Sequence, residues 1–100
     1  MADKVLWSPE ALEDLEALTA YIAASNVAAA IATGRAILQK TRRIPLNPQA
    51  GRVVPERNEP HIREVFHGNY RIIYRLPHTG RHVEIMRIWH GARGEPVIPK

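Results

Sequence analysis

Two neighbouring stretches decide the fold, HIREVFHGNYRIIYR at residues 61–75 and VEIMRIWHGAR at residues 83–93. Both are rich in β-branched and aromatic residues, which favour strands. Gly68-Asn69 separates two such runs, and the turn signal at 77–80 separates the second run from a third. The pattern therefore predicts two hairpins that share a central strand at 69–76, in one antiparallel sheet.

The predicted central strand has two different faces, because strand side chains alternate between the two sides of a sheet. Arginine dominates one face and apolar or aromatic residues dominate the other. The sequence thus predicts one core face and one charged face: Tyr70, Ile72, Tyr74 and Leu76 on the first, Arg71, Ile73 and Arg75 on the second.

Two helices are predicted before this sheet. Val5-Leu6-Trp7 reads as a short strand, and Ser8-Pro9-Glu10 then gives an N-cap, a proline at the first helical position and an acid at the positive end of the dipole. Asn26 is positioned to cap a second helix that ends near Arg43. Gly34, in the middle of that helix, predicts close approach of a neighbouring backbone.

The order of elements predicts an α+β fold in a single domain, residues 1–100. An N-terminal strand and an antiparallel helical hairpin precede a C-terminal antiparallel sheet, and the hairpin packs on the sheet. A proline-rich connection at 44–60 joins the two parts, and a weakly anchored, partly mobile tail follows from residue 91. The predicted core residues are Trp7, Leu12, Leu15, Ile22, Ile31, Leu38, Ile72 and Tyr74.

Charge is unevenly distributed along the chain, whose net charge is +4. Residues 1–34 hold five acids and one base, and residues 35–100 hold thirteen bases and five acids, so the two parts carry about −4 and +8. An arginine-rich pole attracts phosphate or carboxylate partners. The absence of cysteine and of a long apolar run predicts a cytoplasmic protein with no disulfide and no membrane span.

The motifs along the chain resemble those of the RelE/ParE family of toxin–antitoxin toxins. Their order and spacing, taken together, carry the resemblance over nearly the whole chain, and the fold that the family implies agrees with the one predicted above. The motifs are Trp7-Ser8-Pro9-Glu10-Ala11, Asp14-Leu15, Pro48-Gln49-Ala50-Gly51-Arg52, Arg63-Glu64, Gly68-Asn69-Tyr70-Arg71-Ile72-Ile73-Tyr74 and His90-Gly91-Ala92-Arg93.

The family divides by target. Members similar to RelE cut messenger RNA on the ribosome, whereas members similar to ParE poison DNA gyrase, and an antitoxin silences both. The long helical hairpin and Gly51-Arg52 resemble the ParE branch. Unlike many RelE-like ribonucleases, the chain has no lysine between 41 and 99 and no tyrosine after Tyr74. The resemblance thus implies a gyrase-poisoning, plasmid-stabilising toxin, with a ribonuclease or a non-toxic antitoxin-binding module as alternatives.

A ribonuclease would need a general base, a general acid and a cation for the developing phosphorane charge. Arg71, His90 and Arg93 are the candidate catalytic residues for that alternative, and their positions suggest convergence at one end of the sheet. The same trio also suits a plain binding surface. Residues expected to contact the target or the antitoxin are Arg63, Arg71, Arg75, Trp89, His90, Arg93, Val97 and Ile98.

No cofactor or metal is predicted. The remaining histidines lack ligand spacing, and the isolated glycines form no phosphate-binding loop. The resemblance implies a hetero-oligomer with a cognate antitoxin, and the +8 part of the chain predicts that the antitoxin's C-terminal segment is acidic as well as amphipathic.

Overall fold

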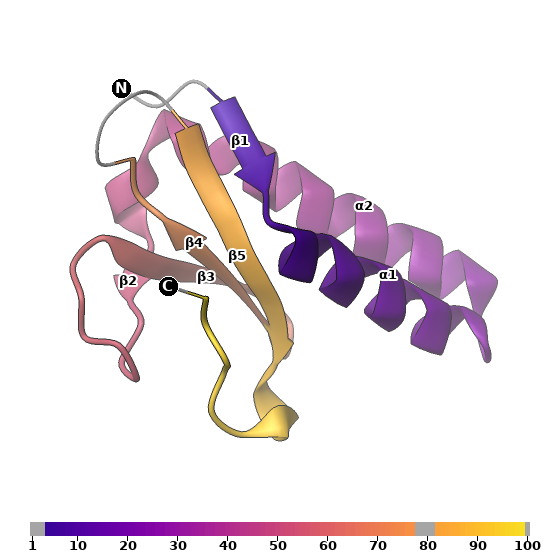
Figure 1. Ribbon diagram of the computed structural model, residues 1–100. Helices are drawn as coiled ribbons and strands as arrows, with labels where there is room; N and C mark the ends of the chain where they lie inside the picture. Colours follow the sequence, from indigo (N-terminus) through magenta and orange to yellow (C-terminus); the bar gives the residue numbers. More distant parts are fainter. Residues whose placement is uncertain (1–3, 78–81, 100) are drawn as a thin grey trace.

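The computed structural model describes residues 4–77 and 82–99, so most of the turn expected at 77–80 lies outside the described residues. A helical hairpin and a five-stranded sheet make up the fold (Figure 1). The strands are β1 (Lys4–Trp7), β2 (Arg52–Val53), β3 (Ile62–His67), β4 (Tyr70–Arg75) and β5 (His82–His90). The helices are α1 (Pro9–Ala23) and α2 (Val27–Arg43), with 3-10 turns η1 (Ile44–Leu46), η2 (Pro48–Ala50) and η3 (Gly91–Arg93).

The predicted three-stranded antiparallel sheet is confirmed, and two short edge strands extend it. The strand order is β1-β5-β4-β3-β2, so β4 is central as expected. β1 pairs with β5 in parallel, which makes the whole sheet mixed rather than antiparallel. A bulge in β5 shifts the register between Ile73 and Tyr74 of β4, because Ile73 pairs with Arg87 and Tyr74 with Ile85.

Both helix starts are capped as predicted. The Ser8 hydroxyl oxygen accepts a hydrogen bond from the Ala11 N–H (3.0 Å), and its own proton goes to the Met86 carbonyl (2.9 Å). The Asn26 side chain accepts from the Ala29 N–H at 2.9 Å. Ser8 therefore fixes the start of α1 and also fastens it to β5.

The main core lies between α1 and the face of the sheet that α1 covers. Ile72 and Tyr74 are fully buried there, as predicted, and Trp7, Leu15 and Ile22 pack around them. Leu12 and Ile31, also predicted as core, are instead about half exposed. Helical periodicity gives the apolar stripe of a helix, and it does not say which part of a wide stripe meets the sheet.

In α2 the fully buried residues are Ile37 and Thr41, and Leu38 is only partly buried. Gly34 faces α1, but an added Cβ would meet only the Thr19 methyl group, at an ordinary contact distance of 3.4 Å, so the predicted close approach of a neighbouring backbone is not found.

The prediction of a charged second face of the sheet is only partly right. That face holds a second, smaller core of Val54, Ile62, Ile73, Met86 and Trp89. Side chains alternate as predicted, but the connection after α2 and the C-terminal tail cover this face. Strand alternation predicts which residues share a face, whereas distant segments decide whether the face is solvated.

The C-terminal tail is held against this second face by side-chain donors. Arg57, Arg87 and Arg75 donate to the carbonyls of Ile98, Val97 and Pro99, and Trp89 Nε1 donates to the Gly94 carbonyl. Ile98 also packs on the second core. The sequence predicted a weakly anchored tail on the basis of its two apolar residues, but these hydrogen bonds to its carbonyls anchor it further.

Candidate functional site

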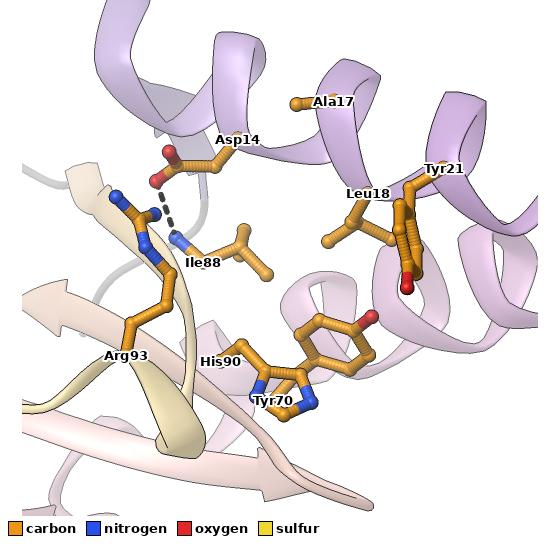
Figure 2. Close-up of a pocket in the computed structure, with 8 residues that line it drawn as sticks. All are labelled: Asp14, Ala17, Leu18, Tyr21, Tyr70, Ile88, His90 and Arg93. Atoms are coloured by element: carbon orange, nitrogen blue, oxygen red, sulfur yellow. Dashed lines mark hydrogen bonds between the residues drawn. The ribbon is translucent and has the colours of Figure 1, made fainter.

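A pocket opens where α1 diverges from the ends of β4 and β5 (Figure 2). Its volume is about 430 Å³. Leu18 and Ile88 give it an apolar floor, and the aromatic residue Tyr21 lies on its helix side. The complete lining is Asp14, Ala17, Leu18, Tyr21, Tyr70, Ile88, His90 and Arg93. The shape and composition suit the apolar side chain of a protein partner better than a charged small molecule.

Asp14 fixes α1 to β5 at the rim of this pocket. Its carboxylate accepts from Arg87 Nε at 2.8 Å and Nη2 at 2.9 Å, and also from the Ile88 N–H at 3.0 Å. This bidentate bond raises the pKa of Arg87. The only acid in the pocket is thus already neutralised by a cation outside it.

His90 lies at the end of β5 and acts as a cap. Its ring meets the Tyr70 ring edge to face, with centroids 5.1 Å apart, and its Nδ1 accepts from the Ala92 N–H at 3.0 Å. With that acceptor role assigned, the neutral imidazole carries its proton on Nε2. The ring nitrogen that lacks a proton in this tautomer is therefore the one that caps η3.

Arg71 projects from the opposite face of the sheet. The register pairs Arg71 with Trp89 and Tyr70 with His90, and adjacent pairs alternate between faces. The Arg71 guanidinium is bound by two carboxylates: Nε lies 2.6 Å from Glu64, and Nη1 and Nη2 lie 2.9 and 2.7 Å from Glu56. Arg71 and His90 both line a pocket of about 420 Å³ beside the β3–β4 turn, but Arg93 does not line it, so the three candidates do not converge in one pocket.

These ion pairs shift the protonation of their members. Hydrogen bonding to Arg71 lowers the pKa of Glu56 to about 2, and the Glu56 carboxylate in turn raises the pKa of Arg71. Glu64 is fully buried and also accepts from Arg52 Nε at 2.7 Å. The positive charge of Arg71 is therefore compensated within the fold.

Arg93 stacks on Trp89 and also reaches the pocket. Its guanidinium carbon lies 4.0 Å from the centre of the Trp89 ring, and that of Arg87 lies 4.8 Å from it. No carboxylate pairs with Arg93 within residues 4–77 and 82–99. Of the three candidate catalytic residues, only His90 and Arg93 share the pocket.

The other residues expected at a binding surface are spread over the second face and the loops. Arg63 donates to the carbonyls of Pro60, Gln49 and Gly51, which fixes the connection after α2. Arg75 lies 3.9 Å from Glu84 and holds the tail. Val97 is exposed, whereas Ile98 is packed. Arg63 and Arg75 thus have structural roles in this fold.

Sequence reasoning missed the part that α1 plays in the pocket. Asp14 gave a usable signal, because it is an acid on the side of the helix that also carries Leu18. Tyr21 gave none, since an exposed tyrosine near a helix end has many uses. Glu56 and Glu64 were also missed as partners of Arg71, because fifteen and seven residues separate them in sequence.

The described residues, 4–77 and 82–99, offer neither a metal-binding cluster nor a membrane-spanning helix. No group of three or more His, Asp or Glu side chains that could hold a metal ion occurs among them. None of the helices described is long and apolar enough to cross a bilayer.

The fold and the pocket define a small α+β protein with a helical hairpin on a mixed sheet and a binding pocket at their junction. The family model described as "ParE toxin of type II toxin-antitoxin system, parDE" matches residues 5–94. The chain therefore belongs to the ParE toxin family.

A solved structure supports the fold. A chain from the structure described as the chromosomal ParDE TA system from P. aeruginosa is similar, with a TM-score of 0.69 and 19% sequence identity. The match covers 87% of this chain and 94% of that one. No match was found among the curated proteins.

Proposed function

We propose that this chain is a cytoplasmic toxin that binds and poisons DNA gyrase, stabilises the plasmid that carries it, and is neutralised by a cognate antitoxin. Membership of the ParE family supports the toxin role. The choice of gyrase over messenger RNA rests on one observation: Glu56 and Glu64 already bind the guanidinium of Arg71. A cation held by two carboxylates is a poor stabiliser of developing phosphorane charge.

The state of His90 supports the same choice. A ribonuclease needs a group that takes the 2′-hydroxyl proton, and His90 Nδ1 is engaged by the Ala92 N–H. Inhibition by contact needs no such group. The pocket offers an apolar floor with Arg93 at its rim, which suits an apolar side chain that has a carboxylate beside it on the partner.

The test compares two activities of the purified protein. We expect a molar excess to block gyrase supercoiling and accumulate cleaved DNA, while a translation extract yields no new messenger RNA ends. Normal supercoiling with messenger RNA cut at defined sites would contradict the proposal in favour of a ribosome-dependent ribonuclease. A protein that neither inhibits gyrase nor causes messenger RNA cleavage, but still binds the antitoxin, would be a non-toxic antitoxin-binding module.

Single substitutions separate contact from chemistry. Under the proposal, His90→Ala and Arg93→Ala each weaken gyrase inhibition about threefold to thirtyfold, as truncations at an interface do. Removing a catalytic group would instead cost roughly 10² to 10³ in rate. A folded His90→Ala protein that binds antitoxin and has lost all toxicity would reverse this assignment.

The salt dependence of antitoxin binding tests how much charge contributes to the complex. Its C-terminal segment is proposed to be acidic and amphipathic, as complement to the +8 part of the chain. Exposed ion pairs are screened over about 8 to 10 Å at physiological ionic strength, whereas apolar anchors are not. Affinity should therefore fall only partly between 50 mM and 500 mM salt. An affinity that does not change with salt would show that charge contributes nothing to antitoxin binding.

A further inference from the structure

Most described arginines in the second half of the chain already have partners inside the fold. They donate to carboxylates or to backbone carbonyls, or they stack on the Trp89 ring. These arginines are Arg52, Arg57, Arg63, Arg71, Arg75, Arg87 and Arg93. The cations most available to a partner therefore lie elsewhere, on α2.

The last turn of α2 carries three exposed cations, Lys40, Arg42 and Arg43, which we call the α2 patch. None of them forms an ion pair in the described part of the chain. Of their side chains only Lys40 makes a hydrogen bond there, to the Phe66 carbonyl. The sequence has no acid at all in residues 17–55. The α2 patch is thus a concentrated positive charge that its own sequence neighbours do not compensate.

The α2 patch lies beside a pocket of about 330 Å³ between the end of α2 and β3. Lys40 and Arg43 line this pocket together with Val65 and Phe66 of β3. Arg35, two turns earlier, instead lines a groove that α2 shares with α1. The Lys40 and Arg43 side of the patch is therefore turned away from the acidic helix α1, so an anion can approach it without repulsion from that helix.

Cations in the last turn of a helix also stabilise the negative end of its dipole. That role needs cations near the helix end, but it does not need three of them open to solvent beside a pocket. A partner with closely spaced negative charges would use all three.

The spacing of the patch suits a phosphate backbone. Guanidinium groups bind phosphate in bidentate fashion, and lysine binds it as a point charge. The phosphates of one DNA strand repeat about every 3.4 Å along the duplex axis, and one helical turn rises about 5.4 Å. Three long cationic side chains on a single turn can therefore reach neighbouring phosphates.

We infer that the α2 patch contacts the phosphate backbone of duplex DNA. The choice of DNA over an acidic protein rests on the proposed function, because a poisoned gyrase holds cleaved DNA. The pocket that is proposed to receive gyrase shares no lining residue with the pocket beside the patch. A toxin bound to gyrase can thus use both surfaces at once.

Three phosphate contacts give weak binding with a defined salt dependence. Each neutralised phosphate adds about −0.9 to the slope of log binding constant against log salt concentration, so the expected slope is about −2.7. Affinity should therefore fall about fortyfold from 50 to 200 mM salt, with a Kd on the order of 10⁻⁴ M at physiological salt. An effective DNA concentration on the order of 1 mM within the gyrase complex makes this contact worth about tenfold in inhibition.

Fluorescence anisotropy of a labelled duplex, titrated with the whole chain in the absence of gyrase, measures the slope. Lys40→Gln, Arg42→Gln and Arg43→Gln should each make it less steep by about 0.9, and the triple variant should lose nearly all of it. Arg35→Gln is the matched control, because it removes the same charge from the same helix on the side shared with α1, and it should keep the parent slope. Circular dichroism confirms that each variant is folded.

If the triple variant does not fold, Arg42→Gln decides alone, because the Arg42 side chain makes no hydrogen bond in the described part of the chain. A parent chain that does not bind the duplex at about 100 μM protein and 50 mM salt overturns the inference. So does a folded triple variant with the parent slope. Displacement of the duplex by less poly-glutamate than unlabelled DNA, counted per charge, would overturn it in favour of an acidic protein partner.

Failure of the proposed function gives a different result. A chain that binds the duplex with the expected slope and leaves supercoiling normal would support the DNA contact and contradict only the choice of gyrase. If both are right, the triple variant should inhibit supercoiling about tenfold more weakly than the parent chain.

Discussion

At the scale of single residues, the buried glutamate Glu64 explains why the arginines of this protein cannot be interpreted from the sequence alone. Its side chain has no exposed surface and accepts hydrogen bonds from Arg52 and Arg71. Breaking a buried ion pair leaves an uncompensated charge, which is far more costly than losing an exposed pair. The stability of the second face therefore depends on this carboxylate.

Glu64→Gln should lower the free energy of unfolding by about 3 kcal/mol, at the low end for a broken buried pair because Glu56 still binds Arg71. Urea denaturation measures this loss in the free energy of unfolding. Glu59→Gln is the control: its partner Arg57 and Glu59 itself are both partly exposed, so the change should stay within about 0.5 kcal/mol. Equal losses in the two variants would refute the role given to Glu64.

The acid stability of the protein should depend on Glu56. Its pKa falls from 4.5 to about 2 in the folded state. A depressed carboxylate pKa means that the folded state binds fewer protons, so the contribution is present above pH 4.5 and lost as pH falls towards 2. Glu56→Gln should make the stability less dependent on pH across this window, which urea midpoints at several pH values would measure. As a control for the substitution itself, the exposed Glu13→Gln should change stability at pH 7 by less than about 0.5 kcal/mol.

At the scale of elements, the junction between β1 and α1 depends on Ser8, whose hydroxyl caps α1 and donates to the Met86 carbonyl. Ser8→Ala should cost about 2 kcal/mol, because a buried carbonyl also loses its partner. Asn26→Ala removes an exposed cap with one bond and should cost about 1 kcal/mol or less. Thermal unfolding of the two variants gives the comparison, and an equal shift in Tm would contradict it.

At the scale of the whole molecule, the tail closes the second core from outside. Ile98 packs on this core, whereas Val97 beside it is 68% exposed. Ile98→Ser should lower the unfolding free energy by about 1 to 2 kcal/mol, and Val97→Ser by less than about 0.5 kcal/mol. Chemical denaturation measures both. If Val97→Ser alone weakens gyrase inhibition, the exposed tail residue is part of the contact surface.

Several features were predictable because they depend on neighbours in sequence. Ser8-Pro9 and Asn26 mark the helix starts, and Gly68-Asn69 gives the β3–β4 turn, with Gly68 at a positive φ of 55° that suits glycine. These signals act within a few residues. The order of the elements and the central place of β4 followed from them.

The sequence by itself thus determined the helical hairpin, its caps and the antiparallel strands, because backbone propensity and periodicity are local properties. Only the tertiary structure decided which side of each helix meets the sheet, how Arg71 is neutralised, and how α1 completes the pocket. Burial and ion pairing join residues far apart in the chain: Asp14 and Arg87 are separated by 73 positions. No local pattern encodes that contact, which exists only once the sheet and the hairpin have packed together.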